Sequence, residues 1–242
     1  IFMKKIIAII AGDPNSINSE IIGKAWKNKS KFKNLNILIL GNYILLKKQF
    51  KSLGFNFKIK KIKNLEKQNF KKDLLIYDIP LKFKNSFNVP ASNKSNYILS
   101  CFEIAIKLVK KKKISGIINC PINKIETFGN NFFGITEYLA KNEKVSGKEV
   151  MLIYNKILSV SPITTHVKLK NVHKYITKRK IINNVKIINN FYIRNFKKKP
   201  KIGMLGLNPH NDELRKNSEE INTIIPAIKI LKKKRIRILG PL

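Results

Sequence analysis

Acidic residues are scarce in this sequence: 14 Asp and Glu stand against 50 Lys and Arg, which gives a formal net charge of +36 over 242 residues. A surplus of this size attracts nucleic acids and anionic lipids without sequence preference. Only five of the basic residues are Arg, however, whereas dedicated nucleic-acid surfaces use Arg and interleaved aromatic residues. Abundant Lys, Asn and Ile are what AT-rich codons produce. We therefore attribute the charge to mutational drift and expect no specific nucleic-acid partner.

Cysteine and long apolar segments are also nearly absent. The two cysteines, Cys101 and Cys120, make neither a disulfide framework nor a zinc cluster, so a reducing compartment is expected. The apolar run after Met3 is too short for a signal peptide and no cleavage site follows it. No segment is long enough to span a bilayer. These absences predict a cytoplasmic protein with no membrane partner.

Glycine-rich phosphate loops are missing as well. The turn after the first apolar run contains a single glycine, Gly12, so it is not a dinucleotide-binding fingerprint. It leads directly into a helix that Asn18 or Ser19 is expected to cap. Such a strand–turn–helix opening can present backbone N–H groups to an anion, but as an isolated signal it is weak.

Hydrophobic residues make up 43% of the chain and occur in short runs that alternate with amphipathic segments. Continuous apolar runs are typical of strands buried on both faces of a parallel sheet. Strands that alternate with helices indicate a doubly wound α/β fold. We expect strands at 5–10, 36–40, 55–62, 74–77, 116–119, 201–205 and 236–239, a hairpin at 150–161, and helices beginning near residue 20 and at 43–53, 97–110, 134–140, 171–196 and 218–234.

Two histidines follow the ends of expected strands. His210 comes after the strand at 201–205, and Pro209 stiffens the turn that carries it. His166 follows the hairpin in the same way. A single loop histidine usually caps a helix or binds water. Two of them at strand ends of an α/β protein are candidates for a shared metal site or for acid–base chemistry.

Two further positions are candidates for contacting an anionic ligand. Lys124 follows the expected strand at 116–119, where it is either a solvated surface lysine or the partner of a phosphate or carboxylate. Thr136 lies at the start of a helix, where it can cap the helix or hold an anion. Each signal is weak by itself, so their order along the chain matters more than any one of them.

Five motifs follow one another along the chain: Gly12-Asp13-Pro14 with Glu20, Pro121-Ile122-Asn123-Lys124, Gly134-Ile135-Thr136-Glu137, Thr164-Thr165-His166 and Gly206-Leu207-Asn208-Pro209-His210. In this order they resemble the motifs of 4-hydroxythreonine-4-phosphate dehydrogenase, an enzyme of pyridoxal 5′-phosphate biosynthesis. The closing segments, 218–220, 225–226 and 240–242, resemble the same family. The resemblance covers the chain but only the larger, first part of a family member, so we expect the sequence to be truncated.

The resemblance implies an isocitrate/isopropylmalate-dehydrogenase-like fold, with two doubly wound α/β domains around a cleft. We expect the first domain, which a family member would re-enter after residue 242, at 1–120. The second domain, at 121–242, is expected to bind metal and substrate and to be truncated. The family further implies a homodimer with the active site at the interface, and a small phosphorylated substrate.

The resemblance also implies a divalent metal, zinc, magnesium or cobalt, held by three histidines. His166 and His210 match two of them, and the third would lie beyond Leu242. Lys124, Ile135 and Thr136 are the expected substrate contacts. Ile135 departs from the family, which has His there, and its side chain makes no hydrogen bond. A lost contact of this kind costs about 1–3 kcal/mol if it leaves a buried partner unpaired.

The implied reaction is the oxidative decarboxylation of 4-phosphooxy-L-threonine to 3-amino-2-oxopropyl phosphate, with NAD or NADP as hydride acceptor. The sequence assigns neither a catalytic acid–base residue nor a cofactor-binding residue. Two alternatives stay open. A paralogous dehydrogenase of another phosphorylated four-carbon hydroxy acid would account for Ile135, and a basic nucleic-acid-binding protein on the same fold would account for the charge.

Overall fold

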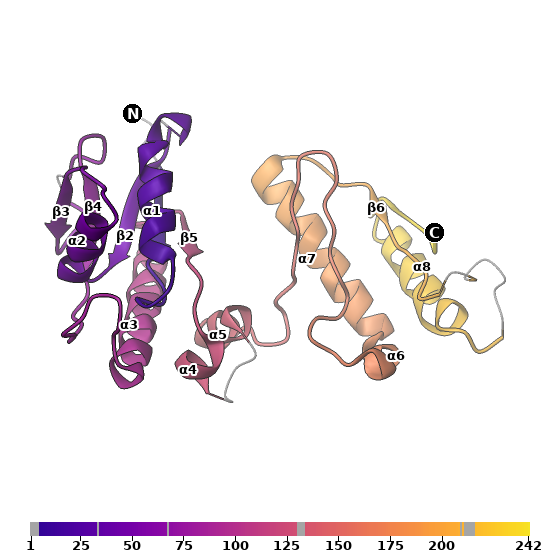
Figure 1. Cartoon of the computed structure of the whole chain (residues 1–242). Helices are drawn as coiled ribbons and strands as arrows, with labels where there is room; N and C mark the ends of the chain where they lie inside the picture. The colour runs from indigo at the N-terminus through magenta and orange to yellow at the C-terminus, as the bar shows by residue number, and fades with distance from the viewer. Residues whose placement is uncertain (1–4, 33, 67, 130–133, 209, 211–215) are drawn as a thin grey trace. The chain divides into compact units, whose positions relative to one another are not determined.

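The computed structural model describes residues 5–32, 34–66, 68–129, 134–208, 210 and 216–242 (Figure 1). The chain divides into two compact units, 1–132 and 133–242. Each unit has a hydrophobic core of its own. The segment 121–132, which the sequence placed with the second domain, lies with the first unit. None of the described helices is long and apolar enough to cross a membrane.

The first unit is built on a five-stranded sheet in the order β3-β4-β2-β1-β5, in which every pair is parallel. From β1 the chain moves outward through β2, then returns to place β5 on the other side of β1. The strand order therefore reverses between β1 and β5, and ligands of open α/β sheets bind at the carboxyl ends of the strands at such a point. The strands are β1 (Ile6–Ile10), β2 (Asn36–Gly41), β3 (Ile59–Ile62), β4 (Leu74–Asp78) and β5 (Gly116–Asn119).

Both faces of this sheet are covered, as the apolar runs predicted. Ile37 and Ile39 of β2 belong to a core cluster with Trp26 of one helix and Phe50 of the next. The alternate residues of β2 are fully buried on the opposite face, where the third helix packs on β1 and β2. The helical elements of this unit are α1 (Asn18–Lys27), η1 (Lys29–Phe32), α2 (Tyr43–Ser52), α3 (Ala91–Lys110) and the short α4 (Lys124–Phe128), which packs on α3.

Four predictions about this unit were wrong in detail. The strand expected at 55–62 begins only at Ile59. The strand at 116–119 is not buried: Ile118 is 55% exposed, because β5 lies at the edge of the sheet. The N-cap of α1 is Ile17, so Asn18 and Ser19 lie inside the helix and cap nothing. Helix α3 begins at Ala91, six residues earlier than predicted.

The second unit pairs two long helices with a small parallel sheet. Residues such as Ile181 and Val185 of α7 and Ile228 and Leu231 of α8 form its core. Its elements are α5 (Ile135–Asn142), η2 (Leu169–Asn171), α6 (Val172–Tyr175), α7 (Lys178–Phe196), β6 (Ile202–Gly203), η4 (Glu220–Ile224), α8 (Ile225–Lys233) and β7 (Ile238–Leu239).

The regular elements of this unit are shorter than the sequence predicted. The helix expected at 171–196 is interrupted after Tyr175, and α7 starts afresh where the Thr177 hydroxyl accepts a hydrogen bond from the Lys180 N–H at 3.2 Å. The expected hairpin is reduced to one antiparallel bridge between Ile153 and Val160. Strands β6 and β7 contain two residues each.

Candidate functional site

The strand order of the first unit reverses between β1 and β5, and the chain segments that follow these two strands are in close contact at this junction. Gly12 has φ +74°, and a Cβ there would lie 2.6 Å from the carbonyl oxygen of Pro121. The Asp13 N–H donates to that same oxygen at 3.1 Å. The Asn18 side chain donates to the carbonyls of Pro121 and Asp13, at 2.8 and 3.1 Å. Asn18 therefore links the two sides of the junction through its side-chain nitrogen, and it does not cap α1 because it is already the first residue of that helix.

A buried lysine links this junction to α4. Lys94 Nζ lies 2.6 Å from Glu126 Oε2 and 3.5 Å from Asp13 Oδ2, and its side chain is only 8% exposed. Burial alone would lower the pKa of Lys94, but Glu126 and Asp13 outweigh it and raise the pKa above its usual value. The Ser95 hydroxyl also donates to the Glu126 carbonyl at 2.5 Å. Sequence reasoning missed Lys94, because no motif distinguishes it from the many surface lysines.

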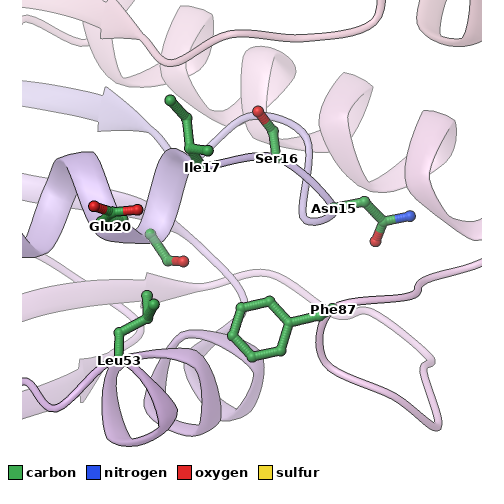
Figure 2. Close-up of a pocket in the computed structure, with 7 residues that line it drawn as sticks. Asn15, Ser16, Ile17, Glu20, Leu53 and Phe87 are labelled. Carbon is green, nitrogen blue, oxygen red and sulfur yellow. The ribbon is translucent and has the colours of Figure 1, made fainter.

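A pocket of about 470 Å³ opens beside the loop that follows β1 (Figure 2). The start of α1 forms one side, and Leu53 and Phe87 face it across the pocket. The rim is held firmly, because Gln49, which is buried, donates to the carbonyls of Pro14 and Ser86 at 2.7 and 2.6 Å. The pocket can take a small organic group. Its lining residues are Asn15, Ser16, Ile17, Ser19, Glu20, Leu53 and Phe87.

Asn15 fixes the same rim from the other side. Its side-chain oxygen accepts from the Val89 N–H at 2.8 Å, and its side-chain nitrogen donates to the Val89 carbonyl at 3.0 Å. One side chain thus satisfies both backbone groups of a residue 74 positions away. This pairing could not be predicted from the sequence, because Asn is abundant throughout the chain.

The three predicted substrate contacts lie at the starts of two helices. Lys124 is the exposed first residue of α4, which the Asn123 side chain caps by accepting from the Glu126 N–H at 3.2 Å. Ile135 and Thr136 are the first two residues of α5. Gly134 occupies the N-cap without a side-chain hydrogen bond, so the predicted capping role of Thr136 was wrong. The Thr136 side chain is exposed and Ile135 is half-buried.

Both predicted metal ligands are exposed loop residues of the second unit. His166 has φ +56°, in the left-handed region that non-glycine residues rarely occupy. Five other described non-glycine residues have φ between +54° and +69°, so this conformation alone does not mark His166 as functional. His210 follows an Asx turn, in which its N–H donates to Asn208 Oδ1 at 2.8 Å. Pro209, which was predicted to stiffen this turn, lies outside the described residues.

The donor chemistry fits a divalent cation, because two imidazoles on exposed loops are suitable ligands for zinc or cobalt. The fit is incomplete. Among the described residues, no group of three or more His, Cys, Asp or Glu side chains could hold a metal ion. At least one ligand in addition to His166 and His210 is therefore needed.

The loop that carries His210 is attached to a buried carboxylate. Glu220, 1% exposed, accepts a hydrogen bond from the Leu207 N–H at 2.7 Å. Burial alone would raise the pKa of Glu220, but hydrogen bonds, first among them that from Leu207, hold the pKa below its usual value. Sequence reasoning used Glu220 only as part of a family motif. An acidic residue at a helix start is too common to stand out.

Comparison with known proteins supports one family over nearly the whole chain. A family model described as pyridoxal phosphate biosynthetic protein PdxA matches residues 33–242. The 4-hydroxythreonine-4-phosphate dehydrogenase of Sulfurihydrogenibium sp. (strain YO3AOP1) is 39% identical, with 98% of this chain and 73% of the relative covered. The corresponding enzyme of Aquifex aeolicus is 35% identical, with 99% and 74% covered. A putative D-threonate 4-phosphate dehydrogenase of Oceanobacillus iheyensis is 30% identical, again with 99% and 74% covered.

Solved structures agree on the fold. A putative 4-hydroxythreonine-4-phosphate dehydrogenase from Salmonella typhimurium superposes with a TM-score of 0.86 at 26% identity, over 99% of this chain and 75% of that one. The enzyme from Burkholderia phymatum has the same TM-score at 24% identity, over 99% and 74%. These neighbours confirm the predicted isocitrate/isopropylmalate-dehydrogenase-like α/β fold.

Proposed function

This chain belongs to the PdxA family of pyridoxal phosphate biosynthetic proteins, and on that premise we propose that it oxidises 4-phosphooxy-L-threonine with a nicotinamide cofactor. The observation that carries this proposal is the family match over residues 33–242. The Thr164-Thr165-His166 and Gly206–His210 motifs, which the sequence identified independently, fall inside the matched range. The protein is thus an oxidoreductase of pyridoxal phosphate biosynthesis.

In the proposed reaction a hydride leaves the hydroxyl-bearing carbon of the substrate for the cofactor, NAD or NADP, and the hydroxyl proton is released. The resulting β-keto acid loses CO₂ and takes up a proton, which yields 3-amino-2-oxopropyl phosphate. When bound, a divalent cation would supply Lewis acidity at the reacting hydroxyl group. His166 and His210 would hold this cation through unprotonated ring nitrogens, so acid should weaken its binding.

Two helix starts, one in each unit, are proposed separately as contacts for the anionic groups of the substrate. Thr136 offers an exposed hydroxyl in the first turn of α5, where the positive end of the helix favours an anionic group. Lys124 offers an exposed ammonium at the start of α4. Ile135 adds an apolar surface where the family has a hydrogen-bonding side chain. We expect Ile135→His to lower the apparent KM for substrate, and an unchanged or higher KM would show that the site has been rebuilt around Ile135.

The test measures the reduction of NAD or NADP by its change in absorbance after 4-phosphooxy-L-threonine and cobalt, zinc or magnesium are added. His166→Ala and His210→Ala should each abolish turnover that depends on the metal. His173→Ala, which alters an exposed histidine of α6, is the matched control. Because turnover tests several roles at once, metal affinity is measured separately. Unchanged affinity in either the His166 or the His210 variant would refute the ligand role of that residue.

A second substrate is favoured by one specific observation, the relative from Oceanobacillus iheyensis described as a putative D-threonate 4-phosphate dehydrogenase. Such a substrate carries a hydroxyl where 4-phosphooxy-L-threonine carries an amine. Ile135 changes the family pattern at a predicted substrate contact, which is where a difference in preference would arise. Comparing kcat/KM for the two phosphorylated acids decides between them.

We also propose that the protein is a homodimer, because the second unit exposes a large apolar surface. The surface joins the bridge segment 151–160 to the end of α7 through stacking of Tyr154 on Phe196 at 5.2 Å and a 2.9 Å hydrogen bond from the Tyr192 hydroxyl to Ser159. We call it the hairpin patch; its members, 37–97% exposed, are Met151, Ile153, Tyr154, Ile157, Leu158, Val160, Phe191 and Phe196.

The size of the hairpin patch fits a second copy of the chain. Aromatic side chains present roughly 150–250 Å² each, and the aliphatic members somewhat less, so this partly exposed patch presents on the order of 800 Å². A stable interface buries about 800 Å² per partner. The members of the patch are uncharged, but Lys156 and Arg194 are exposed in the same two segments, so two basic copies would meet through the apolar side chains with these charges beside the interface.

The oligomeric state is measured by light scattering coupled to size-exclusion chromatography. The unmodified protein should elute as a dimer, and Ile157→Lys should make it monomeric. Leu169→Lys is the matched control, since Leu169 is 88% exposed in the same unit but outside the patch. Added salt should strengthen the dimer because it screens the repulsion between like charges, whereas it weakens nucleic-acid binding. A monomeric unmodified protein would end this proposal.

A further inference from the structure

Basic side chains gather at one edge of the small sheet in the second unit. Strands β6 and β7 are parallel, with Ile202 in register with Ile238, so the segments that lead into them, 197–201 and 232–237, reach the same edge. The Ile202 N–H donates to the Arg237 carbonyl at 2.9 Å, which places the two segments side by side. Together they hold nine Lys and Arg in eleven positions, and all nine are exposed. We call these nine side chains the basic edge.

The density of charge at the basic edge exceeds what the composition predicts. At the chain's average of 50 Lys and Arg in 242 residues, eleven positions would hold two or three. Part of the excess has a local reason, because Lys232 and Lys233 lie in the last turn of α8, where cations complement the helix dipole. Most of the basic edge lies outside such a turn. It also contains two of the five arginines of the chain, Arg235 and Arg237.

No carboxylate balances the basic edge. The sequence contains no Asp or Glu in 150–211 or in 221–242, the two stretches that include α7, β6, α8 and β7. Among the residues that the structure describes, none forms an ion pair with the nine side chains. Like charges on neighbouring strands repel when they are in register, as Lys201 and Arg237 are. A bound polyanion would relieve this repulsion.

We propose that the basic edge binds the sugar–phosphate backbone of a nucleic acid, as a function separate from the proposed dehydrogenase activity. Each Lys or Arg that neutralises a phosphate releases a counterion, which favours binding. Arg235 and Arg237 can each grip a phosphate through two N–H groups. Insertion into a lipid surface is disfavoured, because the two other residues of the segments, Pro200 and Ile236, are half-buried. Phosphate contacts carry no sequence information, so binding of this kind needs no specific nucleic-acid partner.

The test measures the fluorescence anisotropy of a labelled single-stranded RNA of mixed sequence, about 16 nucleotides long, with the full chain at several salt concentrations. If the basic edge neutralises about five phosphates, the logarithm of the affinity should fall against the logarithm of the salt concentration with a slope of roughly −3.5. The edge variant combines Lys199→Gln, Lys201→Gln and Lys233→Gln. It should reduce the magnitude of the slope by about 2, and the affinity at about 0.15 M salt roughly 10–100-fold, since each lost contact contributes about 0.7 to the slope.

The matched control removes the same charge from another exposed cluster of lysines. It combines Lys107→Gln, Lys111→Gln and Lys112→Gln, at the end of α3 in the first unit, and its slope should change by less than about 0.7. Replacing the three edge lysines by arginine instead keeps the charge and should preserve binding. All these substitutions are on the surface, so thermal unfolding should be nearly unchanged.

Three results would overturn the inference. Equal losses in the edge variant and the control would mean that the charge of the whole surface attracts RNA diffusely. No binding of RNA by the unmodified protein at about 0.15 M salt would remove the function itself. Binding that depends on the basic edge to vesicles of equal parts phosphatidylcholine and phosphatidylserine, without binding of RNA, would assign the edge to a membrane surface. None of these measurements depends on metal, cofactor or turnover.

Discussion

Substituting Gly12 by Ala is the most direct probe of the junction between β1 and β5. Gly12 has φ +74°, and Gly54, which follows α2 in the same unit, has φ +71°. An alanine at either position pays the same backbone penalty, roughly 1 kcal/mol for the left-handed region. The two glycines differ only in their surroundings, so the pair separates backbone strain from crowding.

The crowding is specific to Gly12. A Cβ there would lie 2.6 Å from both the Pro121 carbonyl oxygen and Asn18 Nδ2, and 3.0 Å from the Cys120 carbonyl oxygen. A Cβ at Gly54 would meet no heavy atom within 4 Å. Backbone oxygens cannot rotate away, so the junction must open, at a typical overpacking cost of about 1–3 kcal/mol. We expect Gly12→Ala to lower the free energy of unfolding by about 2–4 kcal/mol and Gly54→Ala by about 1 kcal/mol.

Urea unfolding followed by tryptophan fluorescence measures this difference. Trp26 is the single tryptophan of the chain and lies buried in α1, so its emission reports on the first unit alone. The midpoint should fall much further in Gly12→Ala than in Gly54→Ala, with an unchanged slope. Equal losses in the two variants would mean that the junction adapts to a methyl group at no cost, and would refute the tight closure described here.

Three further predictions concern single side chains. Lys94→Met should lower the free energy of unfolding by about 2–3 kcal/mol because it leaves the buried Asp13 carboxylate without its ammonium partner, whereas Lys107→Met, on the exposed face of the same helix, should change it by less than about 0.5 kcal/mol; similar losses would contradict the network. His166→Gly should be more stable than His166→Ala by about 1 kcal/mol, since only glycine tolerates φ +56° without strain, and thermal unfolding of the two variants checks the order. Burial raises the pKa of Cys120 to about 11 and that of Cys101 still higher, so both thiols are protonated at pH 8 and should resist iodoacetamide until the protein unfolds; rapid native labelling at pH 8 would contradict the burial.

The elements that could be predicted from the sequence are those whose signal is local. The run Ile6–Ile10 is apolar throughout, and it forms a strand with parallel neighbours on both sides. The position of a strand within the sheet, by contrast, cannot be predicted from the local sequence. The run Gly116–Asn119 also has adjacent isoleucines at its centre, yet it lies at an edge, because the fold of the whole unit decides which strand has one neighbour. The interruption before α7 had a local signal, the Thr177 cap, which a continuous helical pattern concealed.

The candidate site was predictable where motifs are short and contiguous, and unpredictable where contacts are long-range. His166 and His210 are recognisable from the residues beside them. The left-handed backbone of His166 is not, since it arises from how the whole loop closes. Lys94 pairs with Asp13, which lies 81 residues earlier in the chain. Glu220 accepts a hydrogen bond from Leu207, which lies 13 residues earlier. In a chain with so many lysines, only coordinates distinguish the buried one.

The outer side of β5 has a consequence for handling the protein. Within the part of the chain that the structure describes, β1 is the one strand hydrogen-bonded to β5, so a row of backbone donors and acceptors along Gly116–Asn119 faces outward beside the exposed side chain of Ile118. Such a rim is a template on which a strand of another molecule can be added. A charged substitution at Ile118 should disfavour such strand addition and so reduce aggregation in concentrated solutions, without any change to the buried core.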